Sequence, residues 1–342
     1  MSDAIAAADL LGPEGPFARE VPGFAPRVSQ QAMAEAVEAA IADRQMLIAE
    51  AGTGTGKTFA YLVPALTSGR RVIVSTGTKT LQDQLFHRDL PLVRGVLDAR
   101  LSAALLKGRA NYLCLHRLDQ ARTEGRFASR EQVADLETIR AWSTRTRSGD
   151  RAELADIPED SALWPRVTST TENCLGAECP LFNDCFVVKA RRAAQEADIV
   201  VVNHHLLFAD LAIKQEGFGE ILPGAHAFIL DEAHQIPELA GQFFSVSLSA
   251  RQLGELAGDA LTECAGVGGA LALLQAPLDA LNLGIKRLRL ALDRFPAKGA
   301  MTQVEHDADV DRELAALREA LAALAEALGK HAERSRGLAS VH

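Results

Sequence analysis

A glycine-rich segment at residues 51–58 is the first part of the chain whose residue types and spacing can do chemistry. It reads Ala-Gly-Thr-Gly-Thr-Gly-Lys-Thr. Glycines let backbone N–H groups converge on an anion, and a helix that begins there favours negative charge. In such a loop Lys57 reaches the β- and γ-phosphates of a nucleotide, and the Thr58 hydroxyl coordinates Mg²⁺. A glycine-rich turn that binds nothing is the alternative, and Ala51 stands where the strict pattern has Gly.

Two consecutive acids, Asp231 and Glu232, follow the apolar residues 227–230. A strand that ends there would place Asp231 beside the phosphate loop, where it can hold Mg²⁺ through water. Glu232 would orient and deprotonate the attacking water. His234 completes the sequence Asp-Glu-Ala-His, although a lone histidine more often has a structural role. The candidate catalytic residues are therefore Lys57, Asp231, Glu232 and His234.

Four of the five cysteines can form one metal site. Cys174, Cys179 and Cys185 lie within twelve residues, and Cys114 lies sixty positions before the first of them. Structural zinc sites usually use tighter pairs, and a [4Fe–4S] cluster also takes four thiolates. The spacing favours iron–sulfur, while zinc and unligated thiols stay open. Cys264 is predicted to be a small buried residue in a helix.

Composition sets limits on the class of protein. The 342 residues are 48% apolar and 24% charged, which is typical of globular chains and not of disordered or fibrous ones. No apolar run approaches the roughly 18 residues that span a membrane. The net charge of -9 argues against a protein that coats nucleic acid. Residues 107–130 carry six bases and two acids, a local charge of +4, which is either a solvated helix face or a binding surface.

Short apolar runs at residues 45–49, 71–75, 199–202 and 228–230 predict strands buried on both faces of a parallel sheet. Helical segments at 29–42, 59–66 and 81–85 fall beside them, with Ser29 as a candidate N-cap. Strands that alternate with helices predict an α/β domain. Residues 1–20 have no periodicity and are predicted to be a loose leader.

Two further regions differ from this pattern. Residues 106–190 hold four cysteines and both tryptophans, and we interpret them as an insertion without a large core of its own. After residue 245, apolar residues recur at helical spacing over 278–295 and 314–328, with Gly329 as a candidate C-cap. These two stripes predict an antiparallel helical pair.

Taken in order, the motifs resemble the iron–sulfur DNA helicases of superfamily 2, the XPD-like group, and most of all its bacterial DinG/YoaA branch. The segment 24–30, which ends at Gln30, resembles the adenine-reading Q motif, and residues 50–58 resemble motif I. Residues 75–85 resemble the DNA-contacting motif Ia, 107–114 the lead-in to the first cluster ligand, and 231–234 the DEAH box. The candidate nucleotide-binding residues are then Gln30, Gly52, Thr53, Gly54, Thr55, Gly56, Lys57 and Thr58.

The resemblance implies an ATP-dependent 5′→3′ DNA helicase that acts in DNA repair or replication. It implies a RecA-like P-loop domain at 1–105 and 191–245, a four-Cys iron–sulfur insertion at 106–190, and a helical arch-like domain at 246–342. The implied cofactors are ATP, Mg²⁺ held by Thr58 and Asp231, and a [4Fe–4S] cluster on the four cysteines. Single-stranded or forked DNA, and repair or replication proteins, are the implied partners.

The family pattern includes a second RecA-like domain with an arginine-rich motif, and no such motif occurs before residue 342. We therefore expect an N-terminal half whose isolated activity is weak or nil. The alternative is a non-motor module that binds nucleotide, DNA or a repair partner. An ATPase acting on RNA or protein is disfavoured by the cysteine insertion. The thiol content and the N-terminal residues favour a cytoplasmic protein without a membrane anchor.

Overall fold

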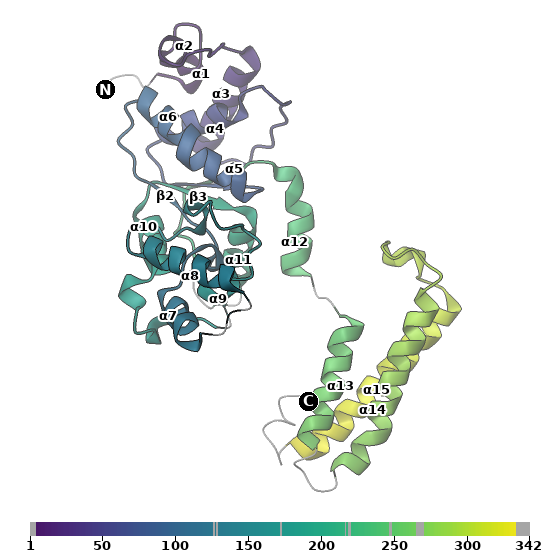
Figure 1. Ribbon diagram of the computed structural model, residues 1–342. Helices are drawn as coiled ribbons and strands as arrows, with labels where there is room; N and C mark the ends of the chain where they lie inside the picture. The colour runs from purple at the N-terminus through teal and green to yellow at the C-terminus, as the bar shows by residue number, and fades with distance from the viewer. Residues whose placement is uncertain are drawn as a thin grey trace. The chain divides into compact units, whose positions relative to one another are not determined.

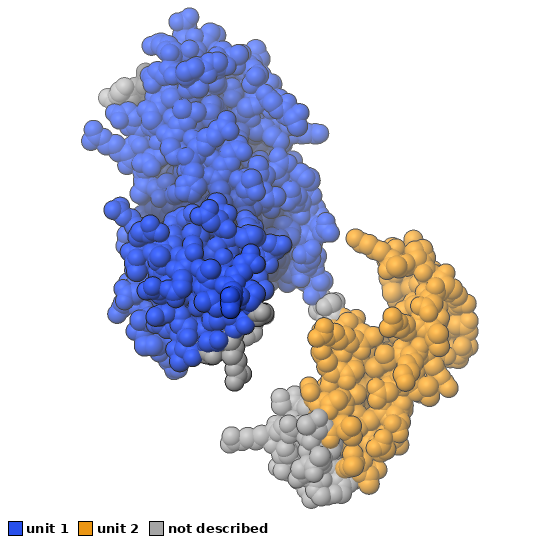
Figure 2. All heavy atoms as spheres, in the orientation of Figure 1, with its two compact units in different colours: residues 1–245 blue, residues 246–342 orange. Residues whose placement is uncertain are grey.

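The computed structural model describes residues 5–125, 127, 129–171, 173–215, 217, 220–245, 248–264 and 270–332. The chain divides into two compact units, residues 1–245 and 246–342 (Figure 2). The first unit contains the sheet and four of the five cysteines, and the second unit is helical (Figure 1).

The first unit is built on a four-stranded parallel sheet with the strand order β2-β3-β1-β4. The strands are β1 (Val72–Thr76), β2 (Ala103–Leu105), β3 (Ile199–Asn203) and β4 (Ala227–Leu230). Every residue of β1 and β3 is buried. The strands predicted at 71–75, 199–202 and 228–230 are therefore confirmed, and the α/β class with a parallel sheet is correct.

Helices cover both faces of this sheet, which explains the continuous apolar runs of its central strands. Val72 and Val74 belong to a core shared with α3 (Val28–Asp43), α4 (Lys57–Thr67) and α6 (Leu90–Val96). Ile73 faces the opposite core, with α10 (Phe186–Glu196) and α11 (His204–Gln215). Alternate residues of one strand thus serve two cores, as the period of a strand requires.

Smaller elements complete the first unit. Helix α5 (Lys79–Gln84) runs into a π-helical turn (Leu85–Asp89), and α12 (Ile236–Phe244) follows the acidic pair. The predicted helix at 29–42 is confirmed as α3, but Ser29 is not its cap, because Arg27 holds the N-cap position without a side-chain hydrogen bond. Single 3₁₀ turns occur in this unit at Arg109–Asn111, Arg151–Glu153, Gly176–Glu178, Phe182–Asp184 and Ala233–Gln235, and the second unit has one at Met301–Gln303.

The strand predicted at residues 45–49 is wrong. This segment is extended but pairs with no strand among the described residues, and Met46 and Ile48 are 91% and 90% exposed. The edge strand β4 is also partly open, with Phe228 53% exposed. Strand formation needs a neighbour that accepts and donates the ladder hydrogen bonds, and an apolar run cannot supply that neighbour by itself.

The predicted loose leader is also wrong. Residues 7–10 form α1 (Ala7–Leu10) and residues 16–20 form α2 (Pro16–Glu20). Leu11 and Phe17 are fully buried in the core that α3 and α4 share with the sheet. A few large apolar side chains anchor this segment, and anchoring of that kind leaves no periodic signal in the sequence.

Residues 106–190, which we expected to lack a large core of their own, have a separate cluster of buried residues that runs from Tyr112 to Phe186. The helices α7 (Leu115–Glu124), α8 (Arg130–Ser143) and α9 (Trp164–Val167) enclose it. Trp164 is 1% exposed and its Nε1 donates to the Pro158 carbonyl at 2.9 Å. Trp142 lies in the same cluster. The two tryptophans supply much of the buried apolar area of this core, which the sequences of the short, charged helices do not indicate.

The second unit consists of α13 (Ala250–Cys264), α14 (Ala270–Leu292) and α15 (Ala308–Ala332). Arg294 pairs with Asp307 beyond the ends of α14 and α15, and Gly284 lies against Leu317, so the predicted antiparallel pairing is confirmed. Gly329 lies inside α15 and is not a C-cap. The side chain of Cys264 lies outside the described residues. Within the described parts of the chain, no helix combines the length and apolarity needed to cross a bilayer.

Candidate nucleotide-binding site

The phosphate loop leads directly into α4, and two of its glycines take backbone angles that favour glycine. Gly54 has φ +77° and Gly56, the N-cap of α4, has φ +83°. The Gln30 Nε2 donates to the Gly56 carbonyl at 3.0 Å, and a Cβ on Gly56 would lie 2.1 Å from that nitrogen. The Thr55 hydroxyl donates to the Gly52 carbonyl at 2.8 Å. Gln30 therefore holds the phosphate loop through a hydrogen bond and also lines the cavity beside it.

The fold brings the acidic pair to this loop from the end of β4. Lys57 Nζ lies 3.4 Å from Glu232 Oε1, and these two side chains are 31% and 30% exposed. Asp231 Oδ2 accepts a hydrogen bond from the Tyr61 hydroxyl at 3.1 Å. The lysine, the candidate metal ligand and the candidate base thus meet at one place, although 175 positions separate Lys57 from Glu232.

Tyr61 is a site residue that the sequence analysis missed. It follows Lys57 by four positions on α4, so both side chains lie on one face of the helix. Burial and the neighbouring Asp231 carboxylate raise the pKa of Tyr61 well above its ordinary value. The phenol therefore stays protonated and donates to Asp231. The spacing of four from the loop lysine is the signal that could have found it.

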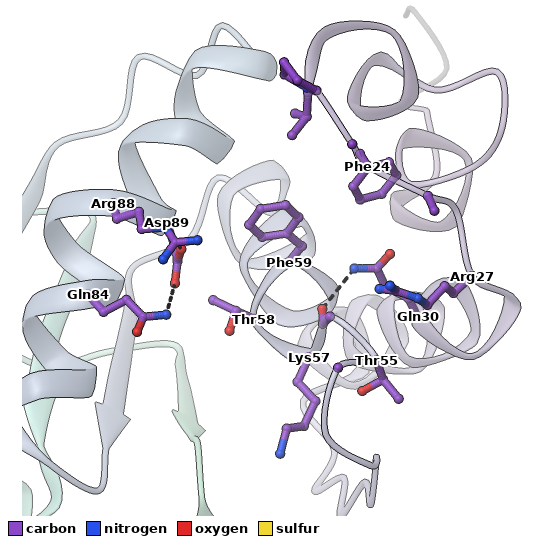
Figure 3. A pocket seen from close by; sticks show the side chains of 16 residues that line it. Phe24, Arg27, Gln30, Thr55, Lys57, Thr58, Phe59, Gln84, Arg88 and Asp89 are labelled. Atoms are coloured by element: carbon purple, nitrogen blue, oxygen red, sulfur yellow. Dashed lines mark hydrogen bonds and ion pairs between the residues drawn. The ribbon is translucent and has the colours of Figure 1, made fainter.

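A cavity of about 530 Å³ opens beside the loop (Figure 3). Gln30 lies on one side of the start of α4, and Gln84, Arg88 and Asp89 lie on the other side. The rings of Phe24 and Phe59 stack with centroids 6.3 Å apart and planes at 19°. The residues that line the cavity are Val21, Pro22, Gly23, Phe24, Ala25, Arg27, Gln30, Gly54, Thr55, Gly56, Lys57, Thr58, Phe59, Gln84, Arg88 and Asp89.

This lining suits a flat base joined to a chain of phosphates. The cavity is lined by the backbone of the loop and Lys57, by the two stacked aromatic rings, and by the amides of Gln30 and Gln84 on its two sides (Figure 3). Asp89 is 8% exposed, and burial raises its pKa above the ordinary value of an aspartate. Gln84 donates to it at 3.4 Å. Asp89 belongs to the π-helical turn that follows α5, and no sequence motif marked it. Gln84 is the last residue of α5 and lies in the segment that resembles motif Ia, but it was not predicted to line this cavity.

The remaining predicted residues lie further out. Gly52 and Thr53 are exposed on the outer part of the loop. The side chain of His234 is 71% exposed, and its Nδ1 lies 3.3 Å from Glu232 Oε2. This contact places the imidazole beside the candidate base at the solvent boundary. The catalytic roles of these residues stay predictions.

The four cysteines are free and half-buried. The thiol of Cys114 lies within electrostatic range of Cys179 and Cys185, and Arg191 is close enough to Cys174 and Cys185 to sense their charge. Burial raises the pKa of Cys114, which opposes the thiolate, while the backbone N–H groups of Arg117 and His116 favour it. Four thiols are the donors that a group bound by thiolates would need. Among the described residues, no three His, Cys, Asp or Glu side chains are already arranged around one ion.

Comparisons with known proteins agree with this geometry. The family model described as DEAD/DEAH box helicase matches residues 29–139, and the model described as DEAD_2 matches residues 153–253. The chain is 53% identical to an ATP-dependent DNA helicase YoaA of Escherichia coli over 251 residues, which is 73% of this chain and 40% of that protein. It is 50% identical to the YoaA helicase of Haemophilus influenzae over 252 residues, 74% of this chain and 39% of that protein.

A third relative, the ATP-dependent helicase DinG of Mycobacterium tuberculosis, is 39% identical over 250 residues, 67% of this chain and 37% of the relative. The chain thus spans about two fifths of the length of the curated relatives it matches. The first family model lies within the unit that carries the phosphate loop and the acidic pair, and the second lies in that unit up to residue 245 and ends at residue 253. The chain belongs to the DinG/YoaA-type group of the DEAD/DEAH box helicases.

Proposed function

We propose that this chain provides the ATP-binding part of an ATP-dependent 5′→3′ DNA helicase that acts in DNA repair or replication in the cytoplasm. The observation that carries the proposal is the meeting of Lys57, Asp231 and Glu232 beside the cavity. In this proposal residues 1–105 and 191–245 form a RecA-like motor domain, 106–190 an iron–sulfur insertion, and 246–342 an arch-like domain. DNA helicase names among the relatives support the choice of substrate.

Each side chain has a role that its surroundings permit. Lys57 binds the β- and γ-phosphates, and the backbone of Gly54 to Gly56 cradles them. Thr58 and Asp231 would hold Mg²⁺, which supplies positive charge against the phosphates. Tyr61 orients the Asp231 carboxylate through its hydrogen bond at 3.1 Å. Glu232 accepts the proton of the attacking water.

We also propose that Cys114, Cys174, Cys179 and Cys185 hold a [4Fe–4S] cluster. Support comes from their half-buried, free thiols and from the electrostatic contacts that link them. Such a cluster would crosslink the segment of Cys114 to the segment that carries the other three cysteines, which begins sixty positions later. Lys107 connects the insertion with α5, because its Nζ lies 2.6 Å from Asp83 of α5 and 2.7 Å from Asp150 of the insertion.

Replacing any one of the four cysteines by serine should remove or degrade the cluster. Anaerobically purified wild-type chain is expected to be brown, with about four iron and four sulfide per chain. Iron and sulfide analysis with the visible absorption spectrum measures this. Cys264→Ser is the matched control and should keep the full iron content. Zinc at one per chain without sulfide would contradict the cluster, and iron loss in Cys264→Ser would contradict the ligand set.

Lys79, the first residue of α5, supports nucleic acid as the second ligand. Partial burial lowers its pKa, and the charge of Arg151 lowers it further, while the charges of Glu159 and Asp150 raise it. Lys107 is buried and already paired with Asp83 and Asp150, so Lys79 and Arg151 are the cations of this group that a phosphate chain would neutralise. The segment with Lys79 is the one that resembles motif Ia.

Removing one of these cations should weaken DNA binding in a salt-dependent way. Lys79→Ala is expected to lower the affinity for a labelled single-stranded DNA and to reduce the slope of log affinity against log salt by about 0.7. Fluorescence anisotropy at several salt concentrations measures both. Lys330→Ala is the control, because Lys330 pairs with Glu326 on α15. An unchanged slope in Lys79→Ala, or equal affinity for RNA of the same sequence, would contradict the proposed site.

A further inference from the structure

His204 is a buried histidine that the roles above do not use. It is the first residue of α11, directly after β3, and it is 0% exposed. Its Nδ1 lies 2.7 Å from Ser75 Oγ on β1, and its Nε2 lies 2.8 Å from the backbone carbonyl oxygen of Asp231. One imidazole thus connects a central strand with the acidic pair.

The partners of this ring fix its tautomer. A carbonyl oxygen only accepts, so Nε2 carries the hydrogen and donates to Asp231. Nδ1 then accepts from the Ser75 hydroxyl. Burial lowers the pKa of His204, which agrees with a neutral ring that makes both bonds. The backbone N–H of Asp231 also donates to the Ser75 carbonyl at 2.9 Å. Both backbone polar groups of Asp231 are therefore held in one closed ring of hydrogen bonds through Ser75 and His204.

The next residue, Glu232, needs this support. It has φ +56° and ψ +42°, the left-handed region that costs a residue with a Cβ roughly 1–2 kcal/mol. The Asp231 carbonyl and the Glu232 N–H belong to the same peptide, so a bond to that carbonyl restrains the rotation that sets φ of Glu232. In this conformation the Glu232 carboxylate reaches Lys57 at 3.4 Å. Strained residues of this kind persist where their surroundings hold them in place.

We propose that His204 is a positioning residue for ATP hydrolysis, which holds the Asp231–Glu232 peptide so that the Glu232 carboxylate faces the nucleotide site. The inference rests on the proposed ATPase function and adds a residue to it. When the imidazole bond is lost, the peptide can rotate, Glu232 can leave the left-handed region, and its carboxylate moves away from the attacking water. ATP binding through Lys57 and the loop is unaffected by that rotation.

The test separates hydrolysis from binding in two variants of similar volume. His204→Leu removes both hydrogen bonds and fills the space, while His204→Gln keeps one donor and one acceptor. We expect His204→Leu to lower the single-turnover hydrolysis rate by about 10–100-fold and to leave ATP affinity within about threefold. His204→Gln should recover most of the rate. Equal rates in His204→Leu and wild type would overturn the inference, and a parallel loss of affinity and rate would indicate a structural role instead.

Two further measurements keep the outcomes distinct. Ser75→Ala removes one oxygen from the same ring and should lower the rate about fivefold; if His204→Leu does not fold, an unchanged rate in Ser75→Ala overturns the inference. Nitrogen-15 NMR of wild type, assigned by the signal lost in His204→Gln, should show a neutral ring protonated at Nε2. An Nδ1-protonated or charged ring would contradict the inference whatever the ATPase result. Wild type that does not bind ATP would instead contradict the proposed function, because the chain is proposed to provide the ATP-binding part of the enzyme.

Discussion

Lys57→Ala is expected to weaken ATP binding by about 100-fold or more, which is about 2.7 kcal/mol of binding free energy. Lys57 is the loop cation that we propose binds the phosphates, and its Nζ lies 3.4 Å from Glu232 Oε1. The fold should stay intact, because the side chain is 31% exposed and a pair of this exposure contributes little to stability. Isothermal titration with ATP and circular dichroism of the same samples measure the two quantities.

Lys214→Ala is the matched control for this result. Lys214 has a similar exposure of 35% and pairs with Asp210 at 2.9 Å in the same unit, but it is remote from the loop in sequence and does not line the nucleotide cavity. Its removal should leave ATP affinity within about twofold of wild type. If Lys57→Ala bound ATP as tightly as wild type, the assignment of residues 51–58 as a phosphate loop would be wrong.

The parts of the site that the sequence predicts are those whose chemistry demands a residue type at a fixed spacing. The loop glycines, Lys57 and the acidic pair are of this kind. So are the apolar runs of the central strands β1 and β3, because a strand buried on both faces must be largely apolar. The order of these motifs also identified the family before the fold was known.

The parts that the sequence does not predict depend on tertiary contacts. Tyr61 and Asp89 carry no motif, and only the packing of α4 and the π-helical turn brings them to the site. His204 was visible as one of two adjacent histidines, but its role depends on Ser75 and on the Asp231 carbonyl, which are 129 and 27 positions away. A single sequence does not report such distances.

The errors of the sequence analysis have the same origin. Residues 45–49 have the composition of a strand, yet pairing is a property of two segments, and their side chains stand exposed. Phe17 anchors a segment that has no periodicity, and Trp164 anchors an insertion whose short helices look too polar to pack. In both cases a few large side chains supply the buried apolar area. Many smaller apolar residues would have formed a periodic pattern that is recognisable in the sequence.

Single-turnover hydrolysis of labelled ATP by wild-type chain and by Glu232→Gln tests most directly whether the phosphate loop and the acidic pair form one hydrolytic site. The substitution keeps the size of the side chain and removes its ability to accept a proton. We expect slow hydrolysis by wild type that requires Mg²⁺, a rate about 100-fold or more lower in Glu232→Gln, and similar ATP affinity in both. Equal hydrolysis rates in the two proteins would contradict the account.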